Sequence, residues 1–410
     1  MRCSALPLLF IVAACGEVVD RPTDLIDDGF DDRFGAGVFA GTRWVQDHVE
    51  LDPGGSTGTF VSRVFDSGAA RAEWNRLRWL PGAPYGKALP DRGESESGYD
   101  AGNFSMQQNV LLAHFDDTVR DSSELELPLL STKLDGYVPG KFGRALADAV
   151  DGYVYTKVDG ASSPLNFGTQ DFSWSLWART TAVCPGNAVY MGLENPGTGL
   201  RPHLWLGCMP AATPTGLLGN TFCSTRSMTT SDCSDVAGKT RINDGQWRHL
   251  AIVKAGHQPG TLTTYVDGVL QGSVQTSYSN ALIFDQDVEF AIGAFSRGTY
   301  PAVGEFDEAA VWRRALTAEE VIALYRRGAQ RLLIQLRACE EPSCSSVPFV
   351  GPDGDPQRWY TDPASAVRPG QLLLTTAVIG RYVQYQVKLE TDEAGGPSPA
   401  LYSLSLGRAE

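Results

Sequence analysis

The sequence predicts an all-β protein made of two sandwiches, and three observations support that prediction. Glycine and proline are frequent, at 44 and 24 of the 410 residues, and helical periodicity is scarce, which favours many short strands joined by turns. Apolar and polar side chains alternate in several stretches, as in residues 382–389, and a period of two is typical of strands. The length is typical of two or three domains.

The N-terminus is predicted to be a targeting segment. Arg2 is the only charge before an apolar run that is too short to span a bilayer and that ends at residue 14. The next residues, Cys15 and Gly16, complete a stretch that resembles a bacterial lipoprotein lipobox. The resemblance implies a signal peptide over 1–14 and acylation of Cys15, with cleavage as an ordinary signal peptide as the alternative. We expect a lipid-anchored protein at the outer membrane or cell surface, because Gly16 is not the aspartate of inner-membrane retention.

Composition and strand patterns divide the rest of the chain. Residues 15–46 are polar and acidic and are predicted to be a flexible tether. The strands in 47–79 and in 331–407 are too few for two sandwiches, so we expect one discontinuous sandwich with a domain inserted in a loop. Residues 80–108 are predicted to be a linker, and 109–328 the inserted domain. The discontinuous sandwich resembles discoidin-like, galactose-binding-type sandwiches.

The inserted domain closes with a predicted strand and short helix over 304–328. Thr317 stands three residues before Glu320, as in a capping box, and Gly328 occupies the place of a left-handed C-terminal cap. This stretch resembles the closing signature of the laminin G-like jellyroll family of the concanavalin A-like lectin/glucanase superfamily. Four earlier segments also resemble the family: 111–123, 140–146, 171–179 and 244–253. The resemblance implies a concanavalin A-like jellyroll sandwich inserted into the second, smaller β-sandwich.

Six cysteines remain besides Cys3 of the signal segment and Cys15, the expected acylation site, and an even number in an exported chain indicates disulfides. Six cysteines allow roughly 15 pairings. A short loop favours Cys339–Cys344, and for the other four we favour Cys184–Cys208 and Cys223–Cys233. A zinc site is the weaker alternative, because the sequence has no Cys-x-x-Cys pair.

Asp307 is the most informative carboxylate, because its neighbours on the same strand face are apolar and it is therefore expected to be partly buried. The family resemblance implies a structural Ca²⁺ held by Asp307 with oxygens near Asp116, Asp117 or Asp121, and calcium takes about 6–8 oxygen ligands. The alternative is that Asp307 accepts backbone N–H bonds at a strand end. The five histidines show no ligand spacing.

The expected function is non-catalytic binding of an extracellular glycan or protein ligand, an inference from the family resemblance. The formal net charge of −14 argues against a nucleic-acid surface, and the only membrane contact expected is the lipid anchor. Glu305 and Asp307 share one strand face and Glu308 takes the other, so the acidic trio of related glycan hydrolases cannot converge. A structural envelope or matrix component and a glycan hydrolase or lyase remain alternatives.

The binding site is expected on loops at one end of the jellyroll or on its concave sheet. Several aromatic residues near turns could stack on a sugar there. They are Tyr153, Tyr155, Tyr190, Trp205 and Tyr300.

Overall fold

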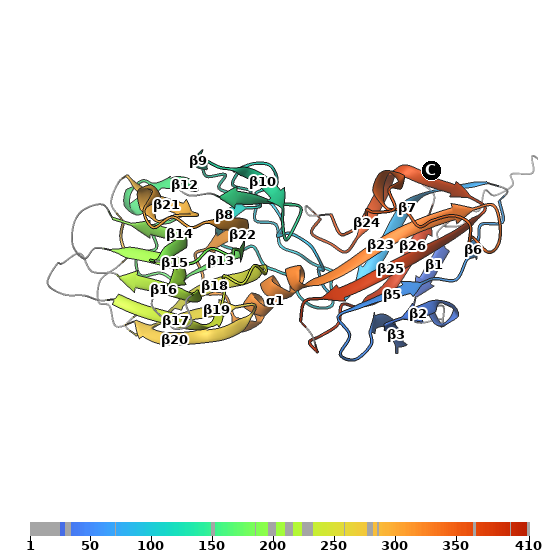
Figure 1. Ribbon diagram of the computed structural model, residues 1–410, viewed down its shortest axis with the longest axis horizontal. Helices are drawn as coiled ribbons and strands as arrows, with labels where there is room; N and C mark the ends of the chain where they lie inside the picture. The colour runs from blue at the N-terminus through green and yellow to red at the C-terminus, as the bar shows by residue number, and fades with distance from the viewer. Residues whose placement is uncertain are drawn as a thin grey trace, which may run out of the picture.

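The protein has two β-sandwich lobes joined at a narrow waist (Figure 1). This computed structural model describes residues 25–28, 34–69, 71–148, 152–184, 186–195, 202–209, 216–223, 233–257, 259–276, 282–284, 287–363, 366–393 and 395–407. Most of its regular structure is antiparallel strands, so the all-β class predicted from the sequence is confirmed. The predicted signal peptide and Cys15 lie outside the described residues. Within them, no helix has the length and apolarity to cross a membrane.

The first lobe is a sandwich of a six-stranded and a five-stranded sheet. The larger sheet has the order β24-β7-β26-β4-β3, with β1 beside β26, and the smaller has the order β2-β5-β25-β23, with β6 beside β25. The strands are β1 Leu25–Asp28, β2 Val38–Ala40, β3 Thr42–Val45, β4 His48–Leu51, β5 Thr57–Val61, β6 Phe65–Asp66, β7 Ala72–Pro81, β23 Gln330–Cys339, β24 Gln371–Gly380, β25 Tyr382–Thr391 and β26 Leu401–Gly407. Early and late parts of the chain therefore share both sheets, around one apolar core.

The flexible tether expected for 15–46 is wrong for its described second half. Phe34, in the short 3₁₀ turn η1 (Phe34–Ala36), is fully buried and packs edge-on against Phe60, with ring centroids 5.5 Å apart. Strands β2 and β3 follow and pair with β5 and β4. The acidic residues that motivated the tether all precede Phe34, whereas the apolar residues after it complete the sandwich core.

The second lobe is the jellyroll, built from two sheets. One has the order β10-β11-β22-β13-β18-β19-β20, with β8 beside β22, and we name it the helix-side sheet; the other, β17-β16-β15-β14-β21-β12-β9, is the outer sheet. The helix-side strands are β8 Asn109–Ala113, β10 Gly136–Pro139, β11 Arg144–Asp148, β13 Phe172–Arg179, β18 Arg248–Ala255, β19 Gly260–Val266, β20 Val269–Thr276 and β22 Gly304–Trp312. The outer strands are β9 Leu130–Thr132, β12 Tyr153–Val158, β14 Ala188–Glu194, β15 His203–Met209, β16 Leu217–Cys223, β17 Cys233–Arg241 and β21 Val288–Ile292.

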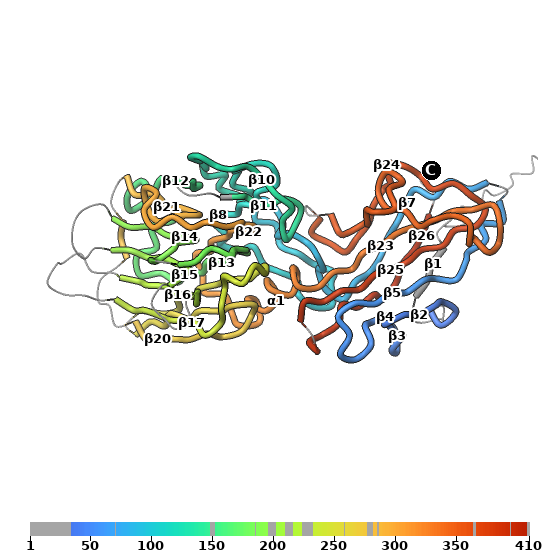
Figure 2. Tube along the Cα trace, viewed as in Figure 1, coloured from blue at the N-terminus to red at the C-terminus, as the bar shows by residue number. Residues whose placement is uncertain are grey.

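The chain passes between the lobes twice (Figure 2). The first passage runs from β7 through residues 82–108, the connecting segment, to β8, and the second runs from α1 (Ala318–Ala329) directly into β23. Residues 80–108, expected to be a linker, do connect the lobes, and part of the segment is packed, because Leu89, Phe104 and Met106 are buried against the helix-side sheet with Trp312. Short 3₁₀ turns are also present: η2 Gly160–Ser162, η3 Ser296–Gly298 and η4 Pro352–Gly354.

Helix α1 begins as the sequence predicts and ends differently. Thr317 accepts a bond from the backbone N–H of Glu320 and Glu320 answers reciprocally, so the capping box is confirmed. Gly328 lies inside the helix, and the C-cap is Gln330 in an extended conformation. The left-handed cap predicted at Gly328 is therefore wrong. Glycine at position 328 instead lets α1 pack closely on Trp177, because a Cβ there would lie 2.5 Å from the Trp177 ring.

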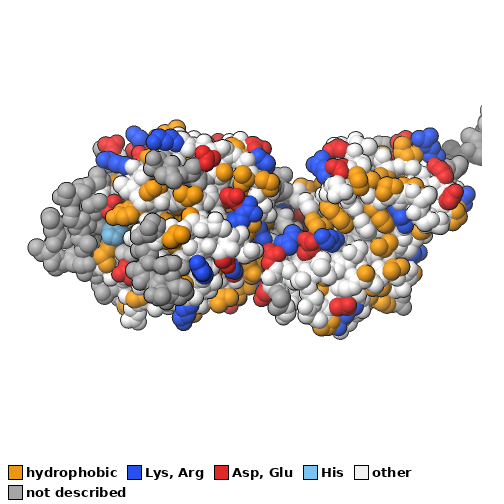
Figure 3. Space-filling model, in the orientation of Figure 1, with side chains coloured by type: hydrophobic (Ala, Val, Ile, Leu, Met, Phe, Trp, Pro, Cys, Tyr) orange, Lys and Arg blue, Asp and Glu red, His pale blue; other side chains and the backbone are white. Residues whose placement is uncertain are grey.

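Charged side chains of both signs gather at the waist on the face seen in Figure 3. Lys141 of the jellyroll reaches Asp392 of the other lobe, with Nζ and Oδ2 2.6 Å apart. Arg331, on β23, contacts the same carboxylate at 2.8 Å. The Lys141–Asp392 ion pair thus crosses between the lobes, and Arg331 braces the same carboxylate from its own lobe.

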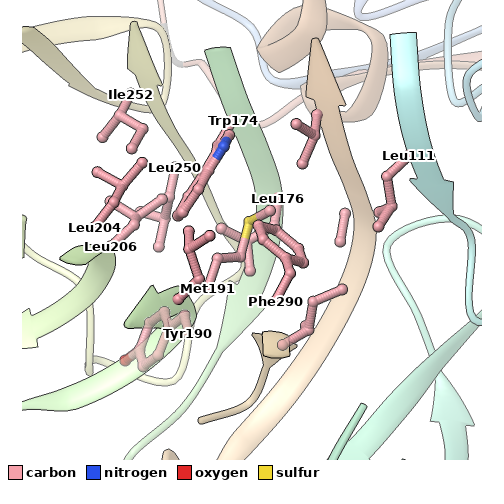
Figure 4. Packing of buried hydrophobic residues seen from close by; sticks show 14 of the residues in the cluster. Leu111, Trp174, Leu176, Tyr190, Met191, Leu204, Leu206, Leu250, Ile252 and Phe290 are labelled. Atoms are coloured by element: carbon pink, nitrogen blue, oxygen red, sulfur yellow. The ribbon is translucent and has the colours of Figure 1, made fainter. Parts of the chain in front are cut away.

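The jellyroll core lies between its two sheets (Figure 4). Trp174 and Leu176 of β13 are fully buried and face Phe290 of the outer sheet, whose ring lies edge-on to Trp174 at 5.0 Å. Three disulfides accompany the cores: Cys184–Cys208 and Cys223–Cys233 in the jellyroll, and Cys339–Cys344 in the other lobe. The core fixes the ends of β13, β14, β21 and β22, where the candidate site lies.

Candidate functional site

Asp307, in the middle of β22, is fully buried, and only one of its two carboxylate oxygens has hydrogen-bond partners among the described residues. Its Oδ2 accepts the backbone N–H groups of Lys141 and Phe142 at 2.7 and 2.9 Å. Its Oδ1 has no hydrogen-bond partner among the described residues. Burial, followed by the nearby Glu308 carboxylate, raises the pKa of Asp307 well above its ordinary value. A buried carboxylate with one free oxygen is costly unless a cation or a proton neutralises it.

Asp116 belongs to the same neighbourhood, and Asp117 does not. Asp116 accepts the backbone N–H of Arg144 at 2.6 Å, and its charge is among the causes that raise the pKa of Asp307. Asp117 is exposed and pairs with the Arg144 side chain at 3.2 Å. Asp121 is fully engaged elsewhere, because its carboxylate accepts the backbone N–H groups of Leu112, Ser123 and Leu127.

Two glycines let the loop between β10 and β11 close over these carboxylates. A Cβ at Gly140 would lie 2.6 Å from Asp307 Oδ2, and one at Gly143 would collide with Asp116 Oδ1. The free Asp307 oxygen and this tight loop fit a hard cation. The side chains alone do not complete a coordination shell, because no group of three His, Cys, Asp or Glu side chains suited to a metal occurs in the described part of the chain. Backbone or water oxygens would supply the remaining ligands.

The histidine near these carboxylates, His114, has a structural role, because it joins two acidic side chains from different segments. His114 Nδ1 contacts Glu308, and its Nε2 lies 2.9 Å from Asp91 of the connecting segment. Burial alone would lower the pKa of His114, but the two carboxylates outweigh it and raise the pKa to about 10. At neutral pH His114 is therefore protonated, and its ion pairs fix the end of β8 to the connecting segment and to β22.

A serine–histidine pair also occurs, and its surroundings argue against catalysis. Ser175 Oγ lies 2.8 Å from His249 Nε2, and both residues are buried. Burial lowers the pKa of His249 to about 3. Asp267 accepts the backbone N–H of His249 rather than its ring, so the third group of a triad is not in place.

A candidate binding site is a pocket of about 460 Å³ at one end of the jellyroll, at the opposite end of β22 from α1. Two loops form it: 180–187 connects β13 to β14, and 293–303 connects β21 to β22. Because β13 pairs with β22 and β14 pairs with β21, both loops cross between the sheets side by side. We name this cavity the crossover pocket.

The rim of the crossover pocket is apolar and exposed. Val183 is 70% exposed, Tyr300 53% and Val303 40%. Tyr300 adopts a left-handed backbone conformation with φ of 48°, and its carbonyl accepts the backbone N–H of Val189 at 3.0 Å. The backbone of Tyr300 is thus held to β14, and its ring, which lies 6.2 Å from the Phe295 ring, keeps an exposed face on which a sugar could stack.

Two constraints hold the opposite loop of the crossover pocket. The Cys184–Cys208 disulfide ties the loop to β15. Thr180 Oγ1 donates to the carbonyl of Val303 at 2.6 Å and accepts the backbone N–H of Ala182. Asn187, half-buried in the same loop, also lines the pocket.

The other aromatic candidates from the sequence are less suited to stacking. Trp205 is 5% exposed, packed with Val189 and Phe295. Tyr153 and Tyr155 lie side by side on β12, and neither lines the crossover pocket. Helix α1 and the connecting segment pack on the outer face of the helix-side sheet and cover part of it. Exposure and the meeting of the two loops are tertiary properties, so the sequence could not rank Tyr300 first or find Asn187.

Comparison with known proteins supports the jellyroll. Residues 149–322 match the family model described as "Concanavalin A-like lectin/glucanases superfamily". No curated protein matches the chain.

Similar solved structures include Domain 4 of AbnA, a GH43 extracellular arabinanase from Geobacillus stearothermophilus, with 20% identity, a TM-score of 0.39 and coverage of 53% of this chain and 98% of that one. The binding domain of Paraclostridial Mosquitocidal Protein 1 aligns with 17% identity, a TM-score of 0.41 and coverage of 53% and 52%. The botulinum neurotoxin serotype D binding domain aligns with 10% identity, a TM-score of 0.41 and coverage of 56% and 53%. The chain thus spans about half the length of these two binding domains.

Proposed function

We propose that this protein is a non-catalytic glycan-binding module of the bacterial cell envelope, with the crossover pocket as its binding site. The observation that carries the proposal is the exposed Tyr300 ring at the rim of a cavity of about 460 Å³. Small-ligand sites typically measure roughly 300–1,000 Å³, and an aromatic face offers a sugar both apolar contact and a fixed orientation. The match to a lectin/glucanase superfamily agrees with this chemistry.

The chemistry of the pocket favours binding over hydrolysis. Glycoside hydrolysis uses a pair of carboxyl groups that flank the scissile bond. No Asp or Glu is among the described residues that line the crossover pocket. Glu305 lies close by in sequence, but its carboxylate is paired with Arg179. We therefore propose a binding module and retain hydrolysis as an outcome that product analysis would detect.

Calcium has a structural role in this proposal. Asp307 and Asp116 would hold the ion, which would neutralise the buried charge and fix the loop from Gly140 to Gly143. This site is separate from the crossover pocket, since none of its residues line that pocket. Chelation is therefore expected to lower stability and to affect sugar binding only indirectly.

The anchoring part of the proposal depends on Cys15. Acylation there would display both lobes at the outer membrane or cell surface. A Cys15→Ser variant expressed in a bacterium should leave the membrane fraction and lose incorporation of a clickable fatty acid. Retention of label in the variant would contradict the anchor.

A glycan array tests the binding function. Soluble protein from residue 16 onward is screened in calcium and in chelator, beside a Tyr300→Ala variant and a Leu373→Ala control. Leu373 is 67% exposed on β24 of the other lobe, so the control removes a similar apolar surface elsewhere. We expect glycan hits that Tyr300→Ala abolishes and Leu373→Ala retains.

Two outcomes would overturn parts of this proposal. An array without reproducible hits under either condition would reject glycan binding and favour a protein ligand or a structural envelope role. Hits that Tyr300→Ala leaves unchanged would reject the crossover pocket as their site.

A further inference from the structure

We infer that the crossover pocket takes an uncharged sugar residue, whose hydroxyl groups are recognised at the pocket floor by the phenol of Tyr190. This inference rests on the proposed glycan-binding function and specifies the chemical class of the ligand. Two independent features carry it: a tyrosine hydroxyl that opens onto the cavity and has no protein partner among the described residues, and the absence of Lys, Arg, His, Asp and Glu from the described wall.

Tyr190, on β14, is 1% exposed and lines the crossover pocket. Its ring packs in the jellyroll core against Phe306, with centroids 5.4 Å apart. In Figure 4 its hydroxyl points away from Met191 and Leu176, out of the apolar cluster. Within the described part of the chain, no group makes a hydrogen bond to this hydroxyl.

A tyrosine hydroxyl that opens onto a cavity without a protein partner keeps its donor and acceptor capacity for a ligand. Burial raises the pKa of Tyr190, so the phenol stays protonated and remains available as a donor. A sugar hydroxyl that enters the pocket would satisfy it. Asn187 lines the same wall and offers an amide donor and acceptor.

The charge of the wall selects the class of sugar. The described lining contains no Lys, Arg, His, Asp or Glu. The nearby charges of Arg179 and Glu305 are paired with each other, and Arg179 also stacks on Trp247 at 4.9 Å. A carboxylate or sulfate on the sugar would lose its water shell in this pocket and find no cation, which is a large penalty. Uncharged sugar residues lack that penalty.

Matched pairs of oligosaccharides that differ only at C6 test the inference. Galacto-, cello- and manno-oligosaccharides are compared with the corresponding uronic acid oligomers by calorimetry at pH 7, using the soluble protein. For the sugar that binds, we expect the neutral member to bind at least about tenfold more tightly than the acidic member. We expect Tyr190→Phe to weaken the neutral sugar roughly 3- to 10-fold, the contribution of one hydrogen bond.

Tyr155→Phe is the matched control, because Tyr155 loses the same hydroxyl on β12, outside the pocket. Thermal unfolding separates binding from folding. Because the phenol of Tyr190 is unpartnered, Tyr190→Phe should leave the melting temperature unchanged or raise it slightly, whereas a structural hydrogen bond would lower it.

The outcomes distinguish this inference from the function on which it rests. Tighter binding of the acidic member, abolished by Tyr300→Ala, would overturn the inference and keep the proposed function. Neutral-sugar binding that is equal in wild type and Tyr190→Phe would overturn the role of Tyr190. Failure of every oligosaccharide here and on the array would overturn both the inference and the proposed function.

Discussion

Arg327 of α1 and Glu96 of the connecting segment form a buried ion pair, with Nη2 and Oε1 2.6 Å apart and neither side chain more than 2% exposed. Lys87 contacts the same oxygen of Glu96 at 3.2 Å. Tyr99 then links Lys87 to Asp362 of the other lobe through hydrogen bonds of 2.9 and 3.0 Å. One buried polar network therefore joins the jellyroll helix, the connecting segment and the second sandwich.

Removing the shared anion should destabilise the protein strongly. Glu96→Gln leaves Lys87 and Arg327 buried without their common carboxylate, and breaking a buried ion pair on one side typically costs about 3–5 kcal/mol. Urea unfolding would measure the loss. Glu94→Gln is the matched control, because Glu94 is exposed two residues away and should change the free energy of unfolding by less than about 0.5 kcal/mol. Similar values for the two variants would contradict a network that stabilises the waist.

The same network predicts a pH dependence through Asp362. Burial, opposed by Lys87, raises the pKa of Asp362 from 3.8 to about 6. The folded state thus binds this proton more tightly than the unfolded state, so this contribution to stability is present below pH 3.8 and is lost as pH rises through 6. The shift of about 2 units corresponds to roughly 3 kcal/mol.

Asp362→Asn should abolish that component. We expect the free energy of unfolding to fall between pH 4 and pH 7 by about 2–3 kcal/mol more in the wild type than in the variant. Urea unfolding at several pH values in this range measures the difference, and the other carboxylates cancel because both proteins contain them. Parallel curves would show that Asp362 titrates normally in the folded protein.

Asp307→Asn should reveal whether calcium occupies the jellyroll site. The amide keeps an acceptor for the N–H groups of Lys141 and Phe142 and removes the buried charge. In chelator, we expect the variant to be at least as stable as the wild type, because the pKa of Asp307 is raised by burial and Glu308. In calcium at 100 times the dissociation constant, the wild type should gain about 2.7 kcal/mol and the variant nothing.

Asp117→Asn is the control for this experiment, because the exposed Asp117 pairs with Arg144 and lies outside the site. It should respond to calcium like the wild type. An equal calcium response in wild type and Asp307→Asn would mean that Asp307 holds no ion and acts only as an acceptor for backbone N–H groups.

The sequence predicts best where the determinants are local. Alternation along β25 and the capping box of Thr317 and Glu320 depend on neighbouring residues, and both were predictable. The burial of Phe34 and Phe104 was not, because a polar, glycine-containing segment with a few apolar residues matches an exposed linker as well as a packed one. These segments are packed because Phe60 of β5 and Trp312 of β22 lie against Phe34 and Phe104, and contacts between such distant residues cannot be read from local sequence.

The candidate site shows the same limit. Asp307 and Asp116 could be predicted as neighbours from the family resemblance, but their fit beneath Gly140 and Gly143 is a long-range contact. Tyr300 is 53% exposed and Tyr190 only 1%, and this difference depends on tertiary packing. The crossover of two loops between sheets, which places one ring at the rim and the other at the floor, is a property of the topology.

Gly328→Ala sets helix propensity against packing. Gly328 lies within α1, where alanine is favoured over glycine by about 1 kcal/mol. The new Cβ would lie 2.5 Å from the ring of Trp177 and 3.0 Å from Phe142. Both rings are buried, and overpacking a core typically costs about 1–3 kcal/mol. We therefore expect a net loss of stability, measurable by urea unfolding.

A second substitution identifies the cause of that loss. Trp177→Phe shortens the ring that Gly328 faces. Gly328→Ala should therefore cost less free energy of unfolding in the Trp177→Phe background than in the wild type. In the double-mutant cycle, the two substitutions together should destabilise the protein by less than the sum of their separate effects. A left-handed cap at Gly328 would produce no such coupling, because its strain would be confined to the backbone. If Gly328→Ala instead stabilised the protein, the rings would have to move aside, and propensity would outweigh the contact with Trp177.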